Sequence, residues 1–185
     1  MVNKVYVIAG AAGSGKTTVA NYLQRQYQMQ RVITHTTRPP RSSEQEGVDY
    51  HFESEQSMER LHLLEEVEYD HHHYGSSMES LEAGWSTGHD NVIVLDTKGA
   101  LTYHQKLPHQ AIIIFLTVSR LTVLAKRMQL RGDQPSAIDS RLHSREYHRD
   151  LNLPNYLKGI AHVIVNDDWT TTKRQIDQLI AQLGK

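Results

Sequence analysis

The 185-residue sequence contains no cysteine, which excludes disulfides, thiolate catalysis and thiolate metal sites. It also lacks long hydrophobic runs: the longest, residues 111–118, is far below the roughly 20 apolar residues that a membrane-spanning helix needs. The N-terminus carries neither a basic segment nor a cleavable apolar stretch. We therefore expect a cytoplasmic protein.

Neither sign of charge is in excess, because 20 basic residues face 21 acidic ones and the formal net charge is -1. Such a chain produces no overall field that would attract nucleic acid or an anionic membrane, so we expect neither as a partner. An anionic ligand must be held by locally clustered cations. At this length we expect one compact domain, as a monomer or a homodimer.

Four short runs rich in β-branched residues predict buried strands. They are Lys4–Ala9, Val92–Leu95, Ala111–Leu116 and His162–Val165. Apolar residues recur at helical spacing after the first run, after the third run and near the C-terminus. These positions are Val19, Tyr22 and Leu23; Leu121, Leu124, Ala125 and Met128; and Ile176, Leu179, Ile180 and Leu183. Strands that alternate with helices predict an α/β fold of three layers with a parallel sheet.

Two polar stretches interrupt this alternation. Residues 33–88 contain Pro39 and Pro40 with several Gly and Ser, and they predict an inserted subdomain with one short helix, Ser54–Glu66. Residues 131–141 separate two predicted helices and predict a lid. We expect a core at 1–32, 89–126 and 142–185, the inserted subdomain at 33–88 and a lid at 127–141.

A glycine-rich segment between the first predicted strand and the first predicted helix fits the P-loop pattern G-x-x-x-x-G-K-[ST] in full. Its backbone N–H groups and the following helix N-terminus would bind phosphate oxygens. Lys16 would reach the β- and γ-phosphates of a nucleoside triphosphate, and the Thr17 hydroxyl would ligate Mg²⁺. The predicted triphosphate-binding residues are Gly10, Ala11, Ala12, Gly13, Ser14, Gly15, Lys16, Thr17 and Thr18. ATPases, GTPases and kinases share this loop, so the loop alone does not identify the acceptor.

A second anion site is predicted in the inserted region. Arg38 and Arg41 flank two prolines that rigidify the chain, and their planar guanidinium groups suit a phosphate to which Tyr50 also donates. A solvated basic turn is the alternative interpretation of this stretch taken alone.

The motif T-T-R-x-x-R followed by E-x-x-G-x-D-Y-x-F resembles the acceptor-binding signature of guanylate kinases. The resemblance covers nearly the whole chain and implies a P-loop NTPase fold that transfers the ATP γ-phosphoryl group to GMP, giving ADP and GDP, with Mg²⁺. It implies that Thr34 contacts the guanine carbonyl, and that Arg38, Arg41 and Tyr50 hold the GMP phosphate. A later Y-G-S resembles another family element, in which Tyr74 contacts the phosphate and Ser76 contacts the base or its neighbours.

The same resemblance makes Glu65 and Asp96 the guanine-reading carboxylates. Guanine offers donors at N1 and N2 where adenine offers an acceptor at N1, so paired carboxylates favour guanine and disfavour adenine. Taken singly, each would be an ordinary solvated or helix-capping acid.

Arginines flank the predicted lid, with Arg127 and Arg131 on one helix and Arg141 and Arg145 on the next. The family pattern implies lid arginines that stabilise the transferring phosphoryl group, and Arg145 is our own extension of that pattern. The predicted catalytic set is Lys16, Arg38, Arg127, Arg131 and Arg141. Asn166 resembles a contact to the donor base, although the Asn-Asp-Asp sequence that it opens is also ordinary turn and helix-capping chemistry.

The chain departs from the family pattern in three places. Val94 stands where many members carry an acid that helps to organise Mg²⁺; the lid is one residue short and contains Pro135; and Thr34 replaces a usual serine. The run of histidines at 71–73 suggests either a metal site or titration near neutral pH, and the latter is favoured because adjacent side chains point in different directions. Two alternatives stay open: a related kinase for another small phosphate ester, and a non-catalytic binding module.

Overall fold

The computed structural model describes residues 3–40, 42, 44–69 and 71–183. Its larger sheet has five strands in the order β2-β7-β1-β8-β9. These strands are β2 (Gln30–Arg31), β7 (Asn91–Val94), β1 (Val5–Ala9), β8 (Ala111–Thr117) and β9 (Ala161–Val165). The pairs β2–β7 and β8–β9 are parallel. All five residues of β1 are buried, as expected for a strand covered on both faces. The four predicted strands are thus confirmed within one or two residues.

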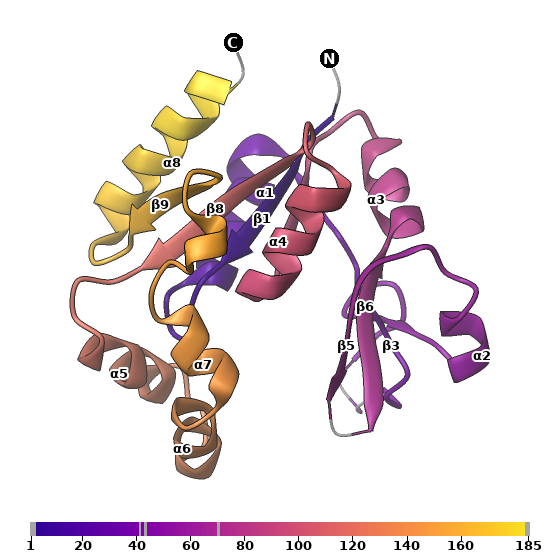
Figure 1. Ribbon diagram of the computed structural model, residues 1–185, viewed down its shortest axis with the longest axis horizontal. Helices are drawn as coiled ribbons and strands as arrows, with labels where there is room; N and C mark the ends of the chain where they lie inside the picture. The colour runs from indigo at the N-terminus through magenta and orange to yellow at the C-terminus, as the bar shows by residue number, and fades with distance from the viewer. Residues whose placement is uncertain (1–2, 41, 43, 70, 184–185) are drawn as a thin grey trace. The chain divides into compact units, whose positions relative to one another are not determined.

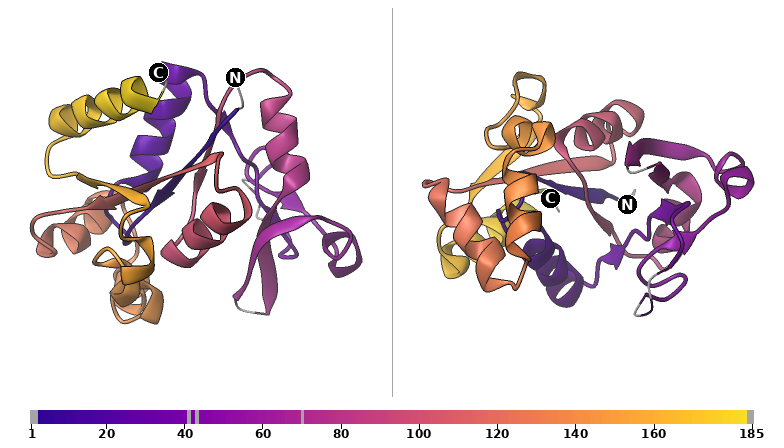
Figure 2. Two further views of the ribbon diagram at one scale, coloured as in Figure 1. Left: turned by 45° about the horizontal axis from the view of Figure 1, so that its top comes forward. Right: turned by 90° about the horizontal axis from the view of Figure 1, so that it is seen from below.

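Helices follow the strands as the apolar spacing predicts. The predicted helices include α1 (Lys16–Tyr27) and α8 (Trp169–Leu183). Two further helices, α3 (Met78–Trp85) and α4 (Thr97–Lys106), lie where the sequence pattern predicted none. Val19 and Leu23 of α1 are fully buried, and Ile176 of α8 is fully buried as well. Helix α8 packs against the edge strand β9, and the two are seen side by side in Figures 1 and 2.

The polar region 33–88 forms a second sheet that the sequence pattern did not predict. Its strand order is β4-β3-β6-β5, with β3 (His35–Thr36), β4 (His51–Phe52), β5 (Leu63–Tyr69) and β6 (His72–Ser77). Strands β5 and β6 pair antiparallel along most of their length, as the long paired ribbon in Figure 1 shows.

The predicted helix 54–66 is wrong over its second half. Helix α2 covers only Glu55–Met58, where Ser54 and Ser57 form a reciprocal capping box. The glutamates that follow have good helix propensity, but β6 lies only a few residues further along the chain and pairs with this segment. Tertiary pairing therefore overrides local propensity, and Glu65 lies on a strand.

The predicted lid contains a helix of its own. Helix α5 (Thr122–Leu130) is followed by α6 (Pro135–Leu142) and α7 (Arg145–Asp150). Pro135 occupies the start of α6, where its missing N–H costs nothing. Ser144 caps α7 with its side chain, so Arg141 and Arg145 belong to different helices and the prediction that they share one is wrong.

The chain forms two compact units. The first comprises residues 1–6, 20–93 and 101–111, and the second comprises 7–19, 94–100 and 112–185. The predicted subdomain 33–88 falls inside the first unit, and the P-loop and the predicted lid fall inside the second. Among the described residues, no helix has the length and apolar character needed to cross a membrane.

Candidate phosphoryl-transfer site

The P-loop connects β1 to α1 through glycines that no other residue can replace. Gly10 has φ +133° and Gly15 has φ +99°, in the region that side chains with a Cβ rarely adopt. A Cβ on Gly10 would lie 2.2 Å from the Leu116 carbonyl oxygen, and one on Gly15 would lie 2.2 Å from Nδ2 of Asn166. Conformation and close packing therefore both require glycine here.

Asn166, which directly follows β9, stabilises the conformation of this loop through hydrogen bonds. Its Nδ2 donates to the carbonyl oxygen of Ser14 at 2.8 Å, and its Oδ1 accepts from the Thr172 hydroxyl at 2.9 Å. Its backbone N–H donates to the Thr117 carbonyl oxygen at 2.8 Å, and the residue is 6% exposed. The predicted contact of Asn166 with the donor base stays a prediction, because the side chain is already engaged in holding the loop.

Lys16 begins α1 and folds back over the loop. Its ammonium donates to the carbonyl oxygens of Gly10 at 2.6 Å and Ala11 at 3.0 Å. Burial lowers the pKa of Lys16 to about 8; Asp150 acts against this shift and Arg141 adds to it. A phosphate group at this position would supply the anionic partner that restores the charged form. Thr17 and Thr18, the next residues of the helix, are exposed.

Two of the three predicted lid arginines converge on one carboxylate. Arg131 binds Asp133 through two hydrogen bonds, Nε–Oδ1 at 2.8 Å and Nη2–Oδ2 at 2.5 Å. Arg141 approaches the same Oδ2 at 3.5 Å. Hydrogen bonding to Asp133 raises the pKa of Arg131, and the same bond lowers the pKa of Asp133. Arg131 and Arg141 therefore meet at Asp133, and the side chain of each is about half exposed to solvent.

Arg127 has different partners from the other lid arginines. Its Nη2 donates to the carbonyl oxygens of Asn166 at 2.8 Å and Asp167 at 3.3 Å. Its Nη1 is buried and has no hydrogen-bond partner among the described residues. Arg127 thus ties α5 to the loop that follows β9, and its predicted catalytic role stays a prediction.

Asp96 follows β7 and caps α4, because its Oδ1 accepts from the backbone N–H of Gly99 at 2.7 Å. Its Oδ2 accepts from Nη2 of Arg149 at 2.8 Å. Arg149 also binds Asp150, which is 5% exposed and accepts from the Thr97 hydroxyl at 2.5 Å. Hydrogen bonds and charge interactions with Asp150 and Asp96 raise the pKa of Arg149 although burial opposes the shift. Sequence reasoning missed Arg149, which carries no motif.

In the first unit, Arg38, Tyr50 and Tyr74 gather from three separate segments. The Arg38 guanidinium lies 5.7 Å from the centre of the Tyr50 ring, and the rings of Tyr50 and Tyr74 are 6.2 Å apart. Nη2 of Arg38 binds both carboxylate oxygens of Glu44, at 2.8 and 3.0 Å. Hydrogen bonding to Glu44, and then to Tyr74, raises the pKa of Arg38 against the effect of burial. Arg41, predicted to join this cluster, lies outside the described residues.

Two predicted base-reading residues of this unit, Glu65 and Ser76, lie on the second sheet, and Thr34 directly precedes its strand β3. Ser76 donates to Oε1 of Glu65 at 3.1 Å from the neighbouring strand and is fully buried. The Tyr103 hydroxyl donates to Ser76 at 2.8 Å, a contact that no sequence pattern indicated. Thr34 accepts the backbone N–H of His51 through its carbonyl oxygen at 2.9 Å and is partly exposed.

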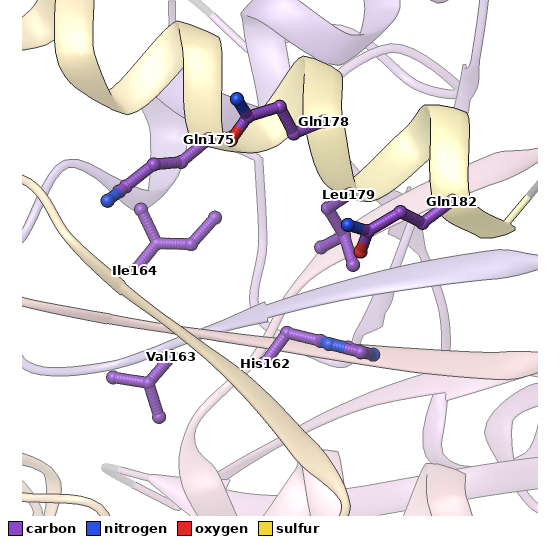
Figure 3. A pocket seen from close by; sticks show the side chains of 7 residues that line it. All are labelled: His162, Val163, Ile164, Gln175, Gln178, Leu179 and Gln182. Carbon is purple, nitrogen blue, oxygen red and sulfur yellow. The ribbon is translucent and has the colours of Figure 1, made fainter.

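A hollow of about 260 Å³ lies elsewhere in the second unit, between α8 and β9. Figure 3 shows the side chains that line it: His162, Val163, Ile164, Gln175, Gln178, Leu179 and Gln182. None of the predicted site residues is among them. Within the described part of the chain, no group of three or more His, Asp or Glu side chains is arranged to hold a metal.

The chain is similar to guanylate kinases along nearly its whole length. The family model "Guanylate kinase" matches residues 2–183. The guanylate kinase of Thermus thermophilus is 35% identical over 173 residues, covering 90% of this chain and 76% of the relative. That of Alkalilimnicola ehrlichii is 32% identical over 178 residues, covering 93% and 85%. The crystal structure of guanylate kinase from Anaplasma phagocytophilum superposes with a TM-score of 0.62 at 27% identity, covering 100% of this chain and 88% of that one.

The parallel sheet, the P-loop and the clustered arginines define a P-loop phosphotransferase. Together with the match along nearly its whole length, they show that the chain belongs to the guanylate kinase family. It is an ATP-dependent nucleoside monophosphate kinase with an α/β fold of the P-loop NTPase type.

Proposed function

We propose that this enzyme transfers the γ-phosphoryl group of ATP to GMP, giving ADP and GDP. The observation that carries the proposal is the clustering of Arg38, Tyr50 and Tyr74 in a chain that also keeps Lys16 and Thr17 in its P-loop. The cluster offers donors to the phosphate of the acceptor, and the loop offers donors to the triphosphate of the other substrate.

Phosphoryl transfer requires that the protein position the two substrates and stabilise the negative charge of the transferring group. The bond between the γ-phosphorus and the ADP oxygen breaks while a bond to a phosphate oxygen of GMP forms, with negative charge spread over the transferring group. Lys16, Arg131 and Arg141 supply positive charge to that group, Arg38 orients the acceptor phosphate, and no covalent enzyme intermediate is required. Thr34, Glu65 and Asp96 are assigned to the guanine base.

The residues present fit Mg²⁺. The ion prefers oxygen ligands and is usually held by one or two protein groups together with substrate phosphates, so a lone exposed hydroxyl suits it. Thr17 would hold the ion, which would neutralise phosphate charge when bound. Val94 is 37% exposed and has no oxygen in its side chain, so Thr17 is the protein ligand that we assign.

A substrate panel tests the function. ADP formation is measured with ATP and Mg²⁺ against GMP, dGMP, AMP, UMP, CMP and ribose bisphosphate, and we expect GMP to give the highest kcat/KM. Turnover only with ribose bisphosphate would identify a kinase for another small phosphate ester. Absence of turnover with every acceptor would favour a non-catalytic binding module, against which the intact Lys16 and Thr17 argue.

The acceptor clamp has its own test. Arg38→Met should raise KM for GMP and leave KM for ATP unchanged, because the guanidinium serves the acceptor phosphate. Arg60→Met is the matched control, since Arg60 is an exposed arginine of the same unit with no side-chain hydrogen bond among the described residues. Equal effects of the two substitutions would contradict the assignment of Arg38.

A further inference from the structure

Three polar side chains form a buried chain of hydrogen bonds inside the first unit. The hydroxyl of Tyr103, on α4, lies 2.8 Å from the hydroxyl of Ser76 on β6. The Ser76 hydroxyl in turn lies 3.1 Å from Oε1 of Glu65 on β5. Tyr103 and Ser76 have no exposed surface, whereas Glu65 is partly exposed. The chain therefore leads from the interior to a carboxylate that solvent and ligands can reach.

The direction of the protons in this chain is fixed by chemistry. Burial raises the pKa of Tyr103, the charge of Glu65 raises it further, and only the bond to Ser76 opposes the shift. The phenol therefore stays protonated and donates a hydrogen bond to the hydroxyl oxygen of Ser76. A serine hydroxyl has one proton, and an ionised carboxylate only accepts, so Ser76 must donate to Glu65.

We propose that Tyr103 is a positioning residue for recognition of the acceptor base, acting on Glu65 through Ser76. The donated hydrogen bond from Tyr103 holds Ser76 in one rotamer and strengthens the bond that Ser76 gives to the carboxylate. The carboxylate is thereby oriented before the ligand arrives. Because a carboxylate has about four lone-pair sites, the bond from Ser76 is compatible with accepting from guanine N1 and N2. This inference rests on the proposed role of Glu65 in reading guanine.

The arrangement also specifies what Ser76 does. Its one proton is committed to Glu65 and its oxygen accepts from Tyr103, so it contributes to base recognition through its neighbour. Of the two roles predicted for Ser76, contact with the base or with the base's neighbours, the buried chain supports the second.

The substitution Tyr103→Phe tests the proposal, because it removes one oxygen and keeps the ring that fills the core. We expect KM for GMP to rise by about threefold to tenfold, the range for loss of one hydrogen bond, with kcat and KM for ATP unchanged. The preference for GMP over AMP should fall by a similar factor. Tyr6→Phe is the matched control: Tyr6 is 3% exposed in the same unit, and burial raises its pKa to about 12. In the part of the chain that the structure describes, no hydrogen bond joins Tyr6 to Glu65.

A double-mutant cycle separates action through Glu65 from general damage. In a Glu65→Gln background, Tyr103→Phe should add little to KM for GMP, because the group that it orients is already altered. Full additivity, or an equal loss of GMP and AMP turnover, would overturn the inference. Should Tyr103→Phe fail to fold, Ser76→Ala interrupts the same chain and should show the same dependence on Glu65.

The cycle also distinguishes this inference from the proposed function. If Glu65→Gln leaves both KM for GMP and the preference over AMP unchanged, the assignment of Glu65 as a guanine reader fails. If Glu65→Gln weakens GMP selectively while Tyr103→Phe and Ser76→Ala behave like Tyr6→Phe, the assignment of Glu65 stands and the inference about Tyr103 fails.

Discussion

ATP binding should weaken as the pH rises through the range in which Lys16 loses its proton. In the ligand-free protein, burial lowers the pKa of this lysine to about 8 from 10.5. The P-loop binds the β- and γ-phosphates through the charged ammonium, so binding selects the protonated form. Each pH unit above the free-protein pKa therefore removes about tenfold of affinity, which corresponds to about 1.4 kcal/mol.

The magnitude follows from the fraction of protein that carries the proton. At pH 7, one unit below the pKa of about 8, roughly nine molecules in ten are protonated, and at pH 9 roughly one in ten. The dissociation constant of ATP with Mg²⁺, measured without acceptor, should rise by about tenfold between these values. Near pH 8, binding should also take up about half a proton.

Isothermal titration calorimetry measures both quantities, because the heat of binding in buffers of different ionisation enthalpy reports proton uptake. The substitution Lys16→Met is the control, since the variant should bind more weakly and lose the pH dependence. A flat affinity from pH 7 to pH 9 with no proton uptake would refute the argument, because Lys16 would then be charged throughout the range. The free energy of unfolding of the ligand-free protein depends on pH in the opposite direction. Between about pH 8 and 10.5 Lys16 is protonated more in the unfolded chain than in the folded protein, so the folded state becomes more stable as the pH rises.

Two further predictions concern the second unit. Gly15→Ala should abolish ATP binding, because the new Cβ would lie 2.2 Å from Nδ2 of Asn166 and residue 15 has φ +99°. A titration with ATP measures the affinity, and an unchanged affinity would contradict this prediction. Arg149→Met should destabilise the fold by about 3 to 5 kcal/mol in urea unfolding, because it leaves Asp150 buried without its cation. Adding Asp150→Asn should recover part of that loss, and a strictly additive loss would rule out this cause.

The central sheet and the P-loop were predictable because their signals are local and strong. A buried strand followed by a full P-loop pattern and an amphipathic helix leaves few alternatives, and β1 and α1 lie where the pattern places them. The second sheet was not predictable in the same way. Its strands β3 and β4 are two residues long, and β5 is rich in glutamate, so its pairing with β6 decides a structure that the local sequence does not indicate.

The residues of the site were predictable where a motif names them, and their supporting partners were not. Arg38, Tyr50 and Tyr74 are distant in sequence, yet the family resemblance groups them through two motifs and the structure places them together. Arg149 and Tyr103 belong to no motif, and only the folded chain shows that each touches a predicted residue. Supporting contacts depend on which elements meet, which is information that a pattern of residue types does not contain.

The supporting partners also differ in what they hold. Asn166 is buried and fixes the backbone of the P-loop through Ser14, so it acts on a loop whose shape every triphosphate would use. Tyr103 instead contacts Glu65 through Ser76, and Arg149 donates directly to Asp96. We assign both carboxylates to the base of one acceptor. Substitutions at Asn166 should therefore lower ATP binding whatever the acceptor, whereas substitutions at Tyr103 should change which acceptor is preferred. The two measurements separate the part of the protein that binds a donor from the part that selects an acceptor.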